Sequence, residues 1–180
     1  QYSPDGGLTW TALVINSQNT ELTVDLADLA GGETALVRVV TSDGFNNSTD
    51  ASESSFVVAE KPPEAYIASP KDATNYPLGQ LIYFQGYATD LEDGAILDPG
   101  SFYWSSTLDG DLGFGDQLII QNLSEGRHTI TLHVEDSSGL TGEFSVEIVV
   151  GAEKNNKDLL GWLAAFGLVF LLLMGLGIVI

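Results

Sequence analysis

The sequence predicts an all-β protein with two β-sandwich domains in tandem, followed by one transmembrane α-helix at the C-terminal end. Short apolar runs recur along residues 1–150 between turns rich in glycine and aspartate. No long stretch of that region shows the 3.6-residue period of an amphipathic helix. Residues 159–180, in contrast, are apolar without interruption.

The C-terminal stretch predicts a membrane anchor. Residues 159–180 contain no charged residue and no Asn, Gln, Ser, Thr or Pro. As a helix they would be roughly 33 Å long, enough to cross a hydrocarbon core of about 30 Å. A soluble core helix of this length would carry a polar stripe, and this segment has none.

Small residues recur along the expected anchor and would let another helix pack closely against it. The alternative is the ordinary glycine content of membrane helices. The residues concerned are Gly161, Ala165, Gly167 and Gly175.

The composition limits the partners. The chain has 25 acidic and 6 basic residues, for a net charge of -19. This charge argues against binding to nucleic acid or to an anionic membrane surface. It fits a solvated extracellular surface, a halophilic habitat or bound divalent cations. The chain has no cysteine, so it has no disulfide, and a prokaryotic source is expected.

Residues 1–60 have the pattern of a β domain. Asp5 opens an Asp-Gly-Gly turn that predicts a hairpin. Apolar patterning predicts strands at residues 8–14, 22–26, 35–41 and 55–59.

This first segment resembles the C-terminal part of a fibronectin type III-like domain. The resemblance rests on residues 26–44 (LADLAGGETALVRVVTSDG) and 52–58 (SESSFVV). The corner tyrosine of the family is absent, with Ala35 or Leu36 near its place. The family has seven strands, so the resemblance implies an incomplete sandwich whose first strands would lie upstream of Gln1.

A second resemblance covers the start of the same segment. Residues 3–10 (SPDGGLTW) match the Asp-box, S-x-D-x-G-x-T-W, of sialidase-type β-propeller blades. The motif implies a folding device for a hairpin and no catalysis. The chain lacks the repeats that a propeller requires.

Residues 61–150 form the second predicted domain, after a boundary at Pro62 and Pro63 that stiffens the linker. Its expected strands lie near residues 65–69, 80–88, 102–106, 118–120, 127–134 and 143–150. Residues 109–116 read as a glycine-rich hairpin rather than a calcium loop, because the glycine and glutamate that such a loop needs are missing.

The second domain resembles polycystic-kidney-disease-type (PKD-like) and related bacterial immunoglobulin-like domains. The resemblance rests on residues 88–90 (ATD), 92–94 (EDG), 103–105 (YWS), 123–128 (LSEGRH) and 134–139 (VEDSSG). A W-D-F-G-D-G run is absent, which favours the broader immunoglobulin-like group. The resemblance implies a spacer or binding module of surface proteins.

No enzyme is predicted. His128 and His133 are expected on opposite faces of one strand, so they cannot share a metal ion. The chain has no cysteine nucleophile, no G-x-S-x-G motif and no phosphate-binding loop.

Carboxylates provide the one candidate site. Asp90, Glu92 and Asp93 follow a predicted strand, and Asp136 is expected at the end of a neighbouring one. Oxygen ligands grouped on turns suit Ca²⁺. The alternative is that these residues only form turns and solubilise the surface. Calcium is the only cofactor considered.

Residues 151–158 form a short polar tether to the anchor. Lys154 and Lys157 would pull this side to the cytoplasm by the positive-inside rule. The resembled domains are exported ones, so we expect both β domains outside the cell membrane and the C-terminus at its cytoplasmic face.

These observations predict a non-catalytic, single-pass cell-surface protein. Its β-sandwich modules would serve as spacer and protein-interaction platform, with other subunits or the upstream part of its own precursor as partners. An accessory subunit of a membrane or envelope assembly fits this description. The alternative is the stalk and anchor of a larger surface hydrolase or adhesin.

Overall fold

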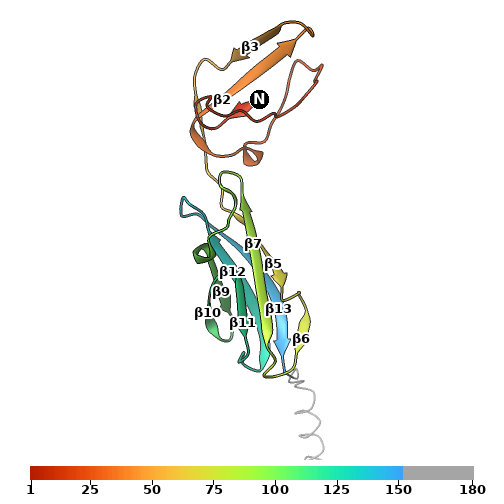
Figure 1. Ribbon diagram of the computed structural model, residues 1–180, viewed down its shortest axis with the longest axis vertical. Helices are drawn as coiled ribbons and strands as arrows, with labels where there is room; N and C mark the ends of the chain where they lie inside the picture. The colour runs from red at the N-terminus through yellow and green to blue at the C-terminus, as the bar shows by residue number, and fades with distance from the viewer. Residues whose placement is uncertain (152–180) are drawn as a thin grey trace, which may run out of the picture.

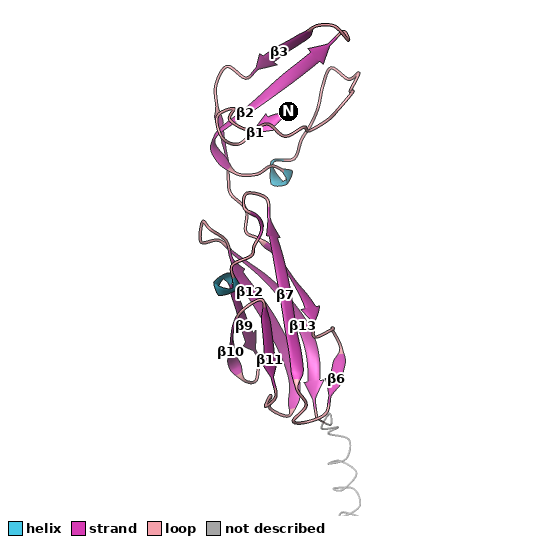
Figure 2. Cartoon of the chain, in the orientation of Figure 1, coloured by secondary structure: helices cyan, strands magenta, loops and turns pink. Residues whose placement is uncertain are grey.

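The computed structural model describes residues 1–151, and over this range it is built almost entirely from β-strands (Figure 2). The all-β prediction is confirmed here. The strands form two groups, one before and one after residues 59–63, and Figure 1 shows the two groups arranged end to end.

The first domain is a single small sheet. Its elements are β1 (Tyr2–Ser3), the 3₁₀ turn η1 (Leu26–Asp28), β2 (Gly32–Ser42), β3 (Asn47–Ala51) and β4 (Phe56–Val58). The long strand β2 lies in the centre, with β1 antiparallel on one edge and both β3 and β4 antiparallel on the other. The buried apolar residues are Tyr2, Leu29, Ala35 and Val58.

Two of the strands expected in this domain do not form. In residues 8–14 only Thr11 makes a bridge, to Tyr2, and residues 22–25 are irregular. Leu26 begins η1, whose N-terminal amide at Ala27 is capped by the Asp25 carboxylate. Leu13 and Val24 are partly buried against the small core, but most of the other side chains stay exposed, with Leu22 at 55%. The expectation of strands at 8–14 and 22–26 was wrong for this reason.

Strand β3 was missed for the opposite reason. Its sequence, NSTDA, is polar and all five residues are exposed. It pairs with β2 from Arg38 to Ser42 through backbone hydrogen bonds, to which the Thr41 hydroxyl adds one long bond to the Ser48 carbonyl at 3.5 Å. A strand held in this way has no apolar alternation by which it can be found.

The second domain has two packed sheets. One has five strands in the order β10-β9-β12-β13-β6, and the other contains β11, β7 and β5, with β8 paired to β7. The elements are β5 (Glu64–Ser69), β6 (Thr74–Tyr76), β7 (Ile82–Asp90), β8 (Gly94–Ala95), the 3₁₀ turn η2 (Pro99–Ser101), β9 (Phe102–Ser106), β10 (Gly110–Phe114), β11 (Gln117–Ile120), β12 (Gly126–Glu135) and β13 (Thr141–Val150). The predicted hairpin over residues 109–116 is confirmed by β9 and β10.

The core of this domain lies between the two sheets. Ile130, Leu132 and Val134 on β12 are fully buried, as their alternation predicts. Trp104 packs edge-on against Phe84 of the facing sheet, with ring centroids 5.4 Å apart. The indole N–H of Trp104 donates to the Gly115 carbonyl at 2.8 Å, so its polar atom is satisfied inside the core.

Glycine is required at one position of this interface. A Cβ at Gly86 would lie 2.4 Å from a Leu132 methyl and 3.1 Å from the Trp104 ring. The two sheets could approach so closely only where β7 has no side chain.

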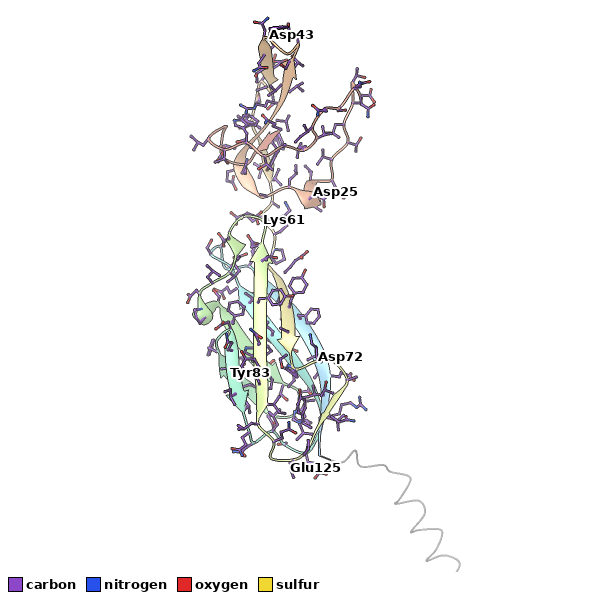
Figure 3. The ribbon with its side chains drawn as sticks, turned by 45° about the vertical axis from the view of Figure 1, so that its right-hand side comes forward. Asp25, Asp43, Lys61, Asp72, Tyr83 and Glu125 are labelled. Carbon is purple, nitrogen blue, oxygen red and sulfur yellow. The ribbon has the colours of Figure 1, made fainter. Side chains whose placement is uncertain are left out.

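Two polar contacts connect the domains. The Lys61 ammonium donates to the Leu29 carbonyl, and the Gly31 amide donates to the Glu92 carboxylate. Lys61 lies at the junction in Figure 3. Gly31 also packs against the linker, since a Cβ there would lie 2.5 Å from the Glu60 Cα. The junction is therefore a contact surface as well as a covalent link.

No helix within residues 1–151 is long and apolar enough to cross a membrane. The predicted anchor, with Gly161, Ala165, Gly167 and Gly175, lies outside the described residues, as does the tether beyond Gly151.

Candidate functional site

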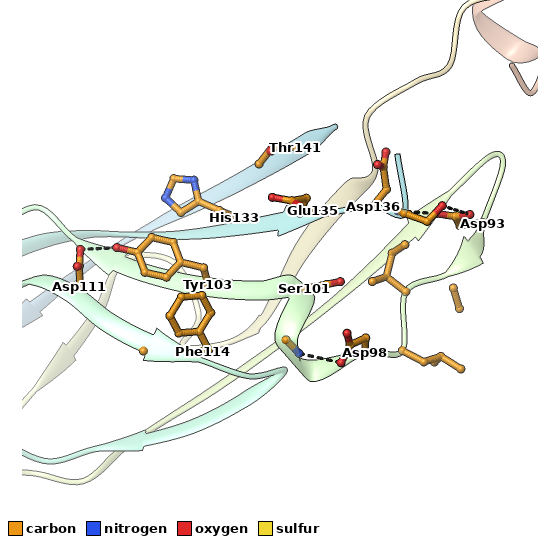
Figure 4. Close-up of a pocket in the computed structure, with 16 residues that line it drawn as sticks. Asp93, Asp98, Ser101, Tyr103, Asp111, Phe114, His133, Glu135, Asp136 and Thr141 are labelled. Carbon is orange, nitrogen blue, oxygen red and sulfur yellow. Dashed lines mark hydrogen bonds between the residues drawn. The ribbon is translucent and has the colours of Figure 1, made fainter. Parts of the chain in front are cut away.

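A groove of about 1090 Å³ lies at the end of the second domain nearer the first, over the outer face of the five-stranded sheet (Figure 4). Its floor is made by side chains of β9, β10 and β12 that point away from the core, because alternate residues of a strand face opposite sides. Its wall is the connection from Asp93 to Ser101.

Aromatic rings form one part of the floor. The Tyr103 ring lies 5.1 Å from the Phe114 ring and 5.4 Å from the His133 ring, measured between centroids. The Tyr103 hydroxyl donates to the Asp111 carboxylate, and this hydrogen bond raises the pKa of Tyr103 above its usual value. Phe114 is 67% exposed, so the groove offers an uncovered aromatic surface.

Carboxylates surround these rings. The lining includes Asp93, Asp98, Asp111, Glu135 and Asp136, and it includes no lysine or arginine within the described part of the chain. Asp98 caps η2 by accepting from the Gly100 amide at 3.1 Å (Figure 4). The groove is therefore rich in acidic side chains, and His133 is the one imidazole among its described lining residues.

Three polar side chains beside the groove form a Ser–His–Glu chain. The Ser105 hydroxyl lies 3.1 Å from His133 Nε2, and His133 Nδ1 lies 2.8 Å from a Glu143 oxygen. The order of contacts resembles a hydrolytic triad. However, β9 is paired on both sides at Ser105. The backbone amides around the hydroxyl therefore serve the sheet, and no pair of them is positioned to stabilise an oxyanion.

His128 lies on the face of β12 opposite to that of His133. Its side chain is fully buried. Its Nδ1 is 2.8 Å from the Ser106 hydroxyl, and its Nε2 is 2.8 Å from the Ser124 carbonyl. Both ring nitrogens are therefore used, and His128 fixes the loop before β12 to the end of β9.

The four predicted calcium ligands come from two turns, with Asp90, Glu92 and Asp93 at the turn between β7 and β8 and Asp136 at the turn between β12 and β13. Asp90 accepts from the amides of Glu92 and Asp93 at 2.7 and 2.8 Å. Glu92 accepts from the first domain, at Gly31. Asp93 instead accepts from both the amide and the hydroxyl of Ser137 at 2.9 Å.

Asp136 closes its own turn. Burial acts to raise its pKa, but hydrogen bonds from Ser138 and Leu140 hold the pKa below the usual value. Residues 1–151 contain no group of three or more His, Cys, Asp or Glu side chains that could hold a metal ion. Only Asp90 Oδ2 and Glu92 Oε2 are buried without a hydrogen-bond partner among these residues. Calcium at these residues stays a prediction.

The Asp-box residues of the first domain form a closed turn. Asp5 accepts from the Ser3 hydroxyl at 2.7 Å, the Thr9 amide at 2.8 Å and the Thr9 hydroxyl at 2.6 Å. Thr9 is the largest influence on this carboxyl, and these bonds lower the pKa of Asp5 to about 2. Trp10 closes the turn by donating to the Gly7 carbonyl at 2.9 Å. The motif is a structural element of the fold.

Comparison with known proteins gives the following. No family model matches the chain, and no curated protein matches it. Among solved structures, fibronectin(III)-like modules of Clostridium thermocellum CbhA are similar at 17% identity and a TM-score of 0.38, over 48% of this chain and 94% of that one. An engineered protein is similar at 17% identity and a TM-score of 0.38, over 52% of this chain. The match spans 21% of the engineered protein.

Proposed function

We propose that this is a non-catalytic, membrane-anchored surface protein whose two β domains act as spacer and protein-interaction platform. The observation that carries the proposal is the junction, where the bonds from Lys61 to Leu29 and from Gly31 to Glu92 hold two domains end to end (Figure 1). A spacer requires that domains in a row keep their relative direction.

The polar groups of the second domain support a non-catalytic role. Every hydrogen-bonding nitrogen of His128 is occupied inside the fold. Ser105 and His133 have the contacts of a nucleophile and base but no oxyanion-binding amides nearby. Membership of the fibronectin type III-like and PKD-like groups rests on the sequence resemblances.

The uncovered side of β2 supports a partner for the first domain. Ala35, Val37 and Val39 point to the same side, yet their exposed fractions rise from 0% to 39% and 64%. Apolar side chains that become more and more exposed along one face of a strand are typical of a sheet whose second, covering sheet is missing. We propose that strands from other subunits, or from the upstream part of its own precursor, cover this face.

The anchoring proposal is tested with the full chain and a chain ending at residue 158, both produced behind the same export signal. We expect the full chain to stay in the membrane fraction after carbonate washing and the shortened chain to appear in the medium. Added protease should remove both β domains from intact cells. Protection of the domains, or release of the full chain by carbonate, would contradict the proposal.

The partner proposal is tested by intact mass and N-terminal sequencing of the native protein extracted in mild detergent. Extra strands found on the same polypeptide would support covalent completion, and with it the stalk of a larger surface hydrolase or adhesin. Stable co-purifying chains would support an accessory subunit. A protein that begins at Gln1 and purifies alone would overturn the need for completion.

A further inference from the structure

We propose that the groove over the outer face of the five-stranded sheet binds an arginine-bearing segment of a partner polypeptide. The inference rests on the interaction role proposed above and names the chemistry of the partner. It is carried by three features of the groove, which are its charge, its exposed aromatic surface and the geometry of the carboxylates beside that surface.

The charge of the groove selects a cation. Five of its lining residues are acidic, none of its described lining residues is a lysine or arginine, and the His133 imidazole in the lining is paired with Glu143 at 2.8 Å. Strand β12 also carries Arg127. This residue lies near the start of the strand and is paired with Glu147 at 3.1 Å. The part of β12 that lines the groove starts at His133, near the other end of the strand. The electrostatic field of the groove is therefore complementary to a positively charged ligand and repels an acidic one.

The aromatic surface favours a flat cation. Phe114 is 67% exposed and Leu97 is 83% exposed, although both line the groove. A guanidinium can lie on the face of Tyr103 or Phe114, where the ring quadrupole attracts it. An ammonium is more strongly hydrated and gains less from such a surface.

Carboxylates lie where the edge of a guanidinium stacked on these rings would be. Asp111 is held beside the Tyr103 ring by the hydroxyl of that residue. The Glu135 carboxylate is exposed, lines the groove and accepts no hydrogen bond from the described residues. Such carboxylates accept the paired N–H groups of a guanidinium, and each charge-assisted bond is stronger than a neutral one. A neutral sugar could use the same rings, but it would not use the uncompensated charge.

The test uses the full chain in a neutral detergent and a fluorescein-labelled peptide that contains two arginines separated by glycine. A peptide with citrulline in place of arginine has the same shape without the charge. Binding is followed by fluorescence anisotropy at two salt concentrations, for the native chain and for Phe114→Ser and Glu135→Gln. The control variants are Ile119→Ser, whose side chain is 68% exposed on β11 of the other sheet, and Glu53→Gln in the first domain.

We expect the arginine peptide to bind and the citrulline peptide to bind about tenfold or more weakly. Phe114→Ser and Glu135→Gln should each weaken binding several-fold, and raised salt should weaken it further. The two control variants should bind as the native chain does.

Equal binding of the two peptides, or equal loss in the groove and control variants, would overturn the proposal. Binding of neutral oligosaccharides that is lost in Phe114→Ser, with no binding of the arginine peptide, would overturn it in favour of a sugar site. These outcomes leave the membrane and spacer proposals unaffected, because those are read from fractionation and from distances between the domains.

Discussion

The two domains of this chain bury their apolar side chains to different degrees. In the second domain two sheets face each other and bury a cluster of fourteen apolar residues, whereas the first domain has one sheet and buries four. A sheet needs a second layer to cover its apolar face. We therefore expect the stability of the second domain to exceed that of the first, which has few buried apolar residues and relies on its turns and on neighbouring segments.

The largest expected effect is in the second core. Trp104→Ala should lower the free energy of unfolding by about 3–5 kcal/mol, because it leaves a cavity against Phe84 and an unpaired Gly115 carbonyl. Urea unfolding followed by far-ultraviolet circular dichroism measures the change. Trp10→Ala in the first domain is the matched control and should leave the main transition in place. A loss below about 1 kcal/mol for Trp104→Ala would contradict the comparison.

A smaller effect is expected in the first core. The buried Tyr2 ring places its hydroxyl 2.6 Å from the Ala30 carbonyl. Tyr2→Phe should therefore destabilise the first domain by about 1 kcal/mol. Amide hydrogen exchange should become faster for β2 and remain unchanged for β12. Faster exchange in both domains would mean that they unfold as one unit.

The Asp-box should make the stability of the first domain depend on pH in the acidic range. The folded pKa of Asp5 is about 2, below the value of about 3.9 for an unfolded aspartate. The carboxylate therefore contributes stability above about pH 4, and that contribution is lost as the pH falls through about 2.

NMR signals of residues 3–10 recorded between pH 5 and pH 2 measure this effect, both as spectra and as local exchange rates. In Asp5→Asn the dependence should be absent at these residues, while the rest of the spectrum titrates as before. Loss of the turn signals with the same midpoint near pH 4 in both proteins would contradict the assignment.

Sequence patterns could predict the second domain more fully than the first. In β12, alternate residues meet a core on one side and solvent on the other, so Ile130, Leu132 and Val134 were identified correctly. Residues 8–14 and 22–26 also carry apolar patterns, but only Leu13 and Val24 pack against the small core, and neither segment forms a strand. Pattern alone cannot show whether the opposing layer is present.

The groove could be predicted only in part. Asp93 and Asp136 were selected as turn carboxylates, and the Ser137 bonds to Asp93 do bring their two turns together. The aromatic floor was missed because Tyr103, Phe114 and His133 come from three different strands. The outward parity of Tyr103 next to the buried Trp104 was the available signal, but it does not reveal which strands lie beside β9.

The most direct test of the spacer account is the distance between the domains. The chain has no cysteine, so spin labels can be placed by Ser48→Cys on β3 and by Leu78→Cys, whose native side chain is 60% exposed in the connection between β6 and β7. Pulsed electron paramagnetic resonance then gives the distance distribution in the full chain. We predict one narrow distribution, which broadens in the double variant Lys61→Met, Glu92→Ala, because it removes both contacts between the domains. A broad distribution in the otherwise native chain would contradict a rigid junction, and with it the spacer role.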